Sequence, residues 1–180
     1  MIKIYFQSFS LSKPTVFALP VHAHVRQFLL KELGPEPVNI HQNTFMGRSV
    51  RMKTEKLPYR QLDRPVAPTG SVLRLVLPTA LRHHTLTVES AKQIGEMLNK
   101  FFQQQMIQFV KGQVAVTQNE RAALRSFYKM YEINPTDYDL EEARKVYRDY
   151  RDKVMKANGH FNLMYLDGGA ALRSDFAVAS

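Results

Sequence analysis

The chain contains no cysteine among its 180 residues. This absence excludes disulfide bonds, thiol catalysis and every zinc module that uses cysteine ligands. A chain without disulfides needs no oxidising compartment, so an intracellular, cytoplasmic location is expected. Long hydrophobic runs are missing too. No stretch approaches the ~20 apolar residues of a membrane helix, so insertion into a membrane is not expected.

Familiar catalytic motifs are also absent from the sequence. It has no glycine-rich phosphate-binding loop, no nucleophile elbow and no HExxH zinc motif. We therefore predict no catalytic residue, metal site or cofactor, and a binding role is favoured over an enzymatic one.

The N-terminal stretch MIKIYFQSFSLSKPTVFALPVHA begins with a lysine and ends in small residues, as secretory signals do. However, Gln7, Ser8, Ser10 and Lys13 interrupt the apolar core of about seven residues that a signal requires. We expect this stretch to be part of the fold. The overall composition, 44% hydrophobic and 23% charged, is that of a folded globular protein.

Positive charge is the strongest global feature. The chain carries 25 Lys and Arg against 16 Asp and Glu, a net charge of +9. Residues 44–84 hold eight of the cations and only two acids, so this segment alone has a net charge of +6. Such a concentrated positive field attracts polyanions, chiefly nucleic acid.

The first 80 residues read as strands with one helix. Period-two alternation at 2–6 and 71–77, and the short apolar run 16–19, predict strands. Residues 20–33 predict a helix with Pro20 in its first turn and a stop at Gly34. Further on, residues 38–53 predict one or two strands, and prolines at 58, 65 and 68 predict an extended arm over 56–70.

After residue 87 the apolar period becomes that of a helix. A first helix is predicted from Thr87 to Gly112. A capping box of Thr117 and Glu120 predicts the start of a second helix ending near 131. A third is predicted from Asp139 to about 156, with an apolar face formed by Leu140, Ala143, Tyr147, Tyr150 and Val154.

The predicted fold class is α+β. A small, mostly antiparallel N-terminal sheet with one helix is followed by a three-helix C-terminal part. The predicted organisation is a basic α/β part over 1–80 that includes the arm, a three-helix part over 81–159 and a tail over 160–180.

His22 and His24 are separated by one apolar residue, and this triplet resembles the His–apolar–His motif of nickases of mobile elements, over three residues only. On a strand both rings would face one side and could bind one ion, whereas on a helix they point about 200° apart. Because a helix is predicted here, we expect ordinary surface or boundary histidines. The nickase hypothesis would also need a tyrosine nucleophile and a third ligand, for which the candidates are Tyr128, Tyr131, Tyr147, Tyr150, His41, His83 and His84.

The basic segment is the predicted nucleic-acid surface. Arg51 and Lys53 are expected on one face of a strand, with the arm nearby, while Phe45 and Tyr59 could stack on bases. The third C-terminal helix is an auxiliary candidate in a helix-turn-helix-like pair, although its linker is long for that motif and its charges could equally form salt bridges in solvent. The predicted contact residues are Arg48, Arg51, Lys53, Lys56, Arg60, Arg64, Arg82, Arg144, Lys145, Arg148 and Arg151.

Three functional hypotheses follow. The first is a non-enzymatic nucleic-acid-binding protein, with DNA favoured over RNA. The second is a structural or assembly subunit, for example of a phage-like particle or another homo-oligomer, that uses the arm and the tail to grip neighbours. The third is a metal-dependent single-strand nickase built on the His-x-His pair.

Overall fold

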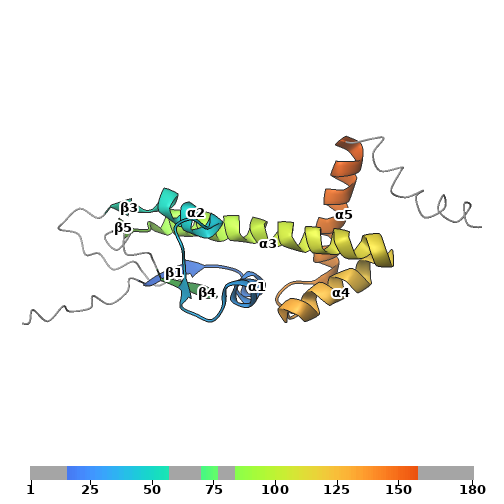
Figure 1. Cartoon of the computed structure of the whole chain (residues 1–180), viewed down its shortest axis with the longest axis horizontal. Coiled ribbons are helices and arrows are strands. Elements are labelled where there is room, and N and C mark those ends of the chain that lie inside the picture. Colours follow the sequence, from blue (N-terminus) through green and yellow to red (C-terminus); the bar gives the residue numbers. More distant parts are fainter. Residues whose placement is uncertain (1–15, 57–69, 77–83, 158–180) are drawn as a thin grey trace, which may run out of the picture. The chain divides into compact units, whose positions relative to one another are not determined.

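The computed structural model describes residues 16–56, 70–76 and 84–157 (Figure 1). The chain divides into two compact units, residues 1–102 and 103–180. The predicted α+β class is confirmed, with a small sheet in the first unit and three helices in the C-terminal part. The predicted strand 2–6, most of the proline-rich arm and the predicted tail lie outside the described residues.

A three-stranded sheet forms the base of the first unit. Its central strand β4 (Val72–Val76) pairs antiparallel with β1 (Val16–Pro20) and parallel with β2 (Val38–Asn39). Alternate side chains face the core, as a period of two requires. The residues that β1 and β4 bury in this way are Phe17, Leu19, Leu73 and Leu75. Both strands were predicted from the sequence.

Helix α1 (Ala23–Leu33) follows β1 and buries Val25, Phe28 and Leu29. It ends, as predicted, at Gly34, whose φ of 96° is a conformation that favours glycine. The predicted start was wrong, because the helix begins after His22 rather than at Pro20.

Pro20 is the last residue of β1 instead, opposite Val72. The next residue, Val21, donates its N–H to the carbonyl of Ser71 at 3.1 Å, so in this antiparallel ladder the position of Pro20 is one whose N–H would point away from β4. A proline at this position therefore removes no hydrogen bond from the ladder. Pairing with β4 places Pro20 in the strand rather than in the helix.

Residues 38–53 differ most from the prediction. Only β2 is a strand, and residues Phe45–Lys53 form helix α2. The side chain of Thr44 caps α2 by accepting the N–H of Gly47 at 3.1 Å. Met46 and Val50, four residues apart, form its buried face. The predicted strand rested on the alternation of Val50 and Met52, but Met52 is 83% exposed.

Helix α3 (Val88–Thr117) starts where predicted, with the Thr87 hydroxyl accepting the N–H of Ser90 at 3.1 Å. It does not end at Gly112, because the helical hydrogen bonds outweigh the modest helix penalty of one glycine. Within the first unit, α2 runs beside α3 (Figure 1) and Phe45 stacks on Phe101 with ring centroids 5.5 Å apart. A short ladder of β3 (Glu55–Lys56) and β5 (His84–Thr85) adjoins these helices in sequence.

The second unit contains α4 (Glu120–Tyr131) and α5 (Leu140–Ala157). The predicted capping box at Thr117 is wrong, because Thr117 is the last residue of α3. Asn119 is the N-cap of α4, and its Oδ1 accepts the N–H of Ala122 at 3.0 Å. Residues 132–139 connect the helices, a connection longer than the turn of three or four residues that a helix-turn-helix uses.

Tyrosines hold α4 against the start of α5. The Tyr128 hydroxyl donates to the carbonyl of Tyr138 at 3.0 Å, and the carbonyl of Asp139 lies 3.2 Å away. Burial raises the pKa of Tyr128 and raises that of Tyr138 to about 12. Tyr128, Tyr131 and Tyr147 are buried, as expected for core residues rather than nucleophiles.

None of the helices in the described parts of the chain is both long and apolar enough to span a membrane.

Candidate nucleic-acid interface

Four predicted contact residues lie on neighbouring positions of α2 and β3: Arg48, Arg51, Lys53 and Lys56, which we call the α2 basic surface. All four are exposed. The predicted arrangement of this surface was wrong, because Arg51 and Lys53 lie on a helix and not on a strand. Two positions on a helix correspond to a rotation of about 200°, so these two side chains leave opposite flanks of α2. Arg48 and Arg51, three residues apart, share a flank.

Two cations of the α2 basic surface donate to neutral groups. Arg48 Nη2 donates to the carbonyl of Asn43 at 3.1 Å, and Lys53 Nζ donates to Gln93 Oε1 at 2.8 Å. Both acceptors are neutral. Among the described residues, no carboxylate forms an ion pair with any of the four cations. Since no acid in the described ranges neutralises them, their field is available to an external anion.

Phe45 was predicted to stack on bases, and 51% of it is exposed. The stacking contact with Phe101 already covers one face of its ring. Tyr59, the other predicted stacking residue, lies outside the described residues, as do Arg60, Arg64 and Arg82.

Three of the four auxiliary residues on α5 converge on one carboxylate of α4. Glu120 Oε2 accepts from Arg144 Nε at 3.5 Å and from Arg148 Nε at 3.3 Å, and Glu120 Oε1 accepts from Arg151 Nη1 at 2.5 Å. The fourth residue, Lys145, is exposed. We call Arg144, Arg148 and Arg151 the arginine cluster.

A second carboxylate extends the network. Glu141 accepts from Arg121 at 2.6 Å and from Arg144 at 3.5 Å. The hydrogen bond from Arg121 is the main cause of the lowered pKa of Glu141. The contact of Glu120 with the arginines was not predicted, because the predicted capping box placed its side chain against the N-terminus of its own helix. The spacing of four and three between the arginines was a signal that they share a face, but not of what they meet.

The two histidines of the His-x-His triplet are not arranged to bind one ion. Their rings stack with centroids 5.5 Å apart and an interplanar angle of 8°. Imidazole lone pairs lie in the ring plane, so two parallel rings at this separation cannot both aim at an ion between them. Within the described ranges, no group of three His, Asp or Glu residues could hold a metal ion.

The expectation for His24 was wrong, because only 6% of it is exposed and its ring packs on Phe102 at 5.0 Å. His22 is the N-cap of α1 and has extended backbone angles, so the 200° separation expected within a helix does not apply to this pair. Both rings can therefore meet over the start of α1.

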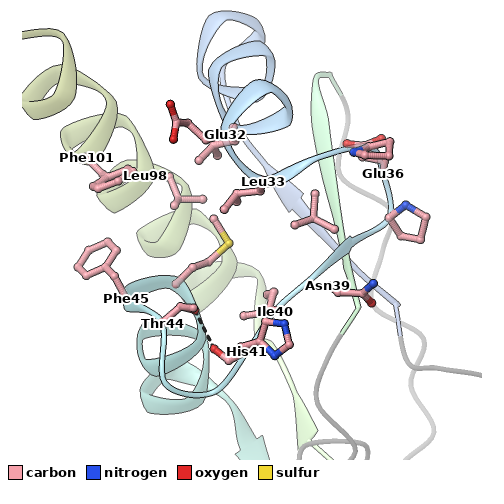
Figure 2. A pocket seen from close by; sticks show the side chains of 15 residues that line it. Glu32, Leu33, Glu36, Asn39, Ile40, His41, Thr44, Phe45, Leu98 and Phe101 are labelled. Atoms are coloured by element: carbon pink, nitrogen blue, oxygen red, sulfur yellow. Dashed lines mark hydrogen bonds between the residues drawn. The ribbon is translucent and has the colours of Figure 1, made fainter. Parts of the chain in front are cut away.

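A pocket of about 770 Å³ opens between α1, α2 and α3 in the first unit (Figure 2). Its walls are mainly apolar and include Leu33, Ile40, Leu98 and Phe101. At its edge, Glu36 accepts from Arg26 Nε at 3.0 Å and from Arg26 Nη2 at 2.8 Å, and the hydrogen bond from Arg26 lowers the pKa of Glu36. The sequence carried no signal for this pocket, because residues 29–46 form it together with Leu98 and Phe101, which are distant from them along the chain.

Comparisons of the chain with protein-family models, curated proteins and solved structures find no match.

Proposed function

We propose that the protein binds nucleic acid without catalysing a reaction, with DNA favoured over RNA, and that it does so chiefly through phosphate contacts from the α2 basic surface. The observation that carries the proposal is the set of four exposed cations that no described carboxylate neutralises. Arg60, Arg64 and Arg82 remain predicted contributors from the same basic segment, and Arg144, Lys145, Arg148 and Arg151 remain auxiliary.

Lysine and arginine side chains that face solvent from a short helix suit backbone contacts, which position a protein on a polyanion without reading its sequence. The exchange releases condensed counterions, so binding must weaken steeply as salt rises. The net charge of +9 acts in the same direction over a longer range.

The test is fluorescence-anisotropy binding to labelled duplex DNA, single-stranded DNA and an RNA strand of the same sequence, across a salt series. Each neutralised phosphate contributes about 0.9 to the log–log salt slope for a duplex and about 0.7 for a single strand. The double substitution Arg48→Ala with Arg51→Ala is expected to weaken duplex binding and to reduce the slope by about 1.8, because two phosphates are no longer neutralised.

The matched control is Lys111→Ala with Lys129→Ala, which removes the same charge from exposed positions in the second unit. It is expected to change the salt slope much less. If the parent protein binds none of the three probes at low salt, the proposal is wrong. Tighter binding to the RNA strand than to either DNA would reverse the preference for DNA.

The second candidate is an assembly subunit, and exposed apolar side chains on α2 favour it. Phe45 and Met52, seven residues apart, lie on one stripe of the helix, and 51% and 83% of them are exposed. A second copy of the chain could cover such a stripe. Light scattering would then find a defined oligomer that Met52→Ser dissociates, whereas a monomer at high concentration would rule this candidate out.

A further inference from the structure

The arginine cluster has more donors than its carboxylate can use. A guanidinium carries five N–H donors, and a carboxylate offers about four lone-pair sites. Arg148 reaches Glu120 only through Nε, and in the described part of the chain neither of its terminal nitrogens has a hydrogen-bond partner. The second contact of Arg151, to Asp152, is long at 3.4 and 3.5 Å.

The cluster also lies at the surface with surplus charge. Three guanidinium groups contact Glu120. The other acids of the network, Glu141 and Asp152, contact Arg144 and Arg151 respectively. Glu141 is shared with Arg121, so the four arginines of the network outnumber its three acids. The side chains of Arg148 and Arg151 are nearly half exposed, while that of Glu120 is only 16% exposed. An anion arriving from solvent would therefore meet the two arginines first.

We propose that Glu120 is an internal competitor that occupies the arginine cluster, and that a phosphate group of a nucleic-acid backbone displaces it. This inference rests on the proposed function and adds to it the regulation of its auxiliary site. The fork of a guanidinium fits two oxygens of a phosphate as well as it fits a carboxylate. A backbone phosphate can therefore take the same donors.

Displacement leaves Glu120 in a favourable place. It is the first residue of α4, where the N–H groups of the first helical turn and the helix dipole stabilise a negative charge. The carboxylate can turn to water without losing that stabilisation, so exchanging it for a phosphate costs only the ion pairs that the phosphate replaces.

Neutralising the competitor is the test. Glu120→Gln keeps the shape of the side chain and removes its charge, so single-stranded DNA is expected to bind about two- to fivefold more tightly, the size of a partly exposed ion pair. The log–log salt slope is expected to steepen by about 0.7 for each further phosphate that the cluster neutralises. Glu142→Gln is the matched control, because it removes the same charge from an exposed position on α5 that makes no hydrogen bond to the cluster.

The outcomes separate the two proposals. No binding by the parent at low salt overturns the proposed function and this inference with it. Binding by the parent with the same change in Glu120→Gln and Glu142→Gln overturns only the inference. A gain in affinity confined to Glu120→Gln supports it.

A second measurement follows the parent protein itself and uses a variant only to assign one resonance. In the ¹⁵N-labelled parent protein, the Nε–H resonance of Arg148, assigned with Arg148→Lys, reports on the bond to Glu120. Displacement predicts that this resonance shifts as the oligonucleotide is added. An unchanged resonance in the saturated complex overturns the inference.

Discussion

Two glycines of α3 show how one residue type can serve opposite purposes. A Cβ built on Gly95 would collide with the carbonyl oxygen of Pro20, so this glycine lets the helix approach the end of β1. A Cβ on Gly112 would meet nothing within 4 Å. At Gly95 close packing requires a residue without a side chain. At Gly112 no contact requires glycine, and its only effect is the backbone flexibility that it adds to the helix.

Replacing each glycine by alanine should therefore change stability in opposite directions. Gly95→Ala is expected to lower the free energy of unfolding by about 1–3 kcal/mol, because helix and strand must separate. Gly112→Ala is expected to raise it by about 0.5–1 kcal/mol, the ordinary advantage of alanine inside a helix. Urea denaturation of both variants checks the pair, and equal shifts would contradict the described contact at Gly95.

At the scale of single elements, the sequence predicted what local patterns control. The short apolar run 16–19 predicted β1, and the apolar spacing of α4 and α5 predicted both helices. Helix α2 was missed because it is short, and a run such as Ser49–Lys53 fits a strand and a helix equally well until Thr44 is recognised as a cap. Consequently the basic residues were predicted, but not the flanks on which they lie.

The N-cap of α4 can be tested by two substitutions. Asn119→Ala removes the side-chain oxygen that accepts the N–H of Ala122, and is expected to cost about 1 kcal/mol of stability. The hydroxyl of Thr117 donates to the carbonyl of Gln113 at the end of α3 and accepts only a long hydrogen bond, at 3.4 Å, from the N–H of Asn119. Thr117→Ala is therefore expected to cost less stability than Asn119→Ala. The urea midpoints of the two variants measure these losses of stability. A larger loss for Thr117→Ala would contradict Asn119 as the N-cap of α4 and favour the predicted capping box at Thr117.

For the whole molecule, charge is the main guide to function. The sequence gives the total charge but not which cations are paired with acids. The net charge of +9 is read directly from the residues, but whether a cation is free depends on its neighbours in space. Arg48 and Arg148 look alike in the sequence. The first meets a neutral carbonyl and the second meets Glu120, and only the fold separates them.

The stability of the protein should fall in alkali. Burial raises the pKa values of Tyr128, Tyr138 and Tyr147 in the folded state, whereas an unfolded tyrosine ionises near pH 10. Above about pH 10 the unfolded chain loses protons that the folded chain retains, so stability is complete below that pH and declines above it. Urea midpoints measured from about pH 8 to about pH 11 should decrease, and less steeply for Tyr128→Phe than for the parent. The same decrease in both proteins would show that Tyr128 does not contribute to the loss of stability at high pH.

The position of Pro20 has a consequence for how copies of the protein meet one another. In the described sheet β1 is an edge strand, and edge strands invite pairing with strands of other molecules, the first step of aggregation. Pro20 lacks a donor at a place where the N–H would point outward from the sheet. Its ring therefore interrupts the row of donors that a foreign strand would need, and β1 is protected from growing into a larger sheet.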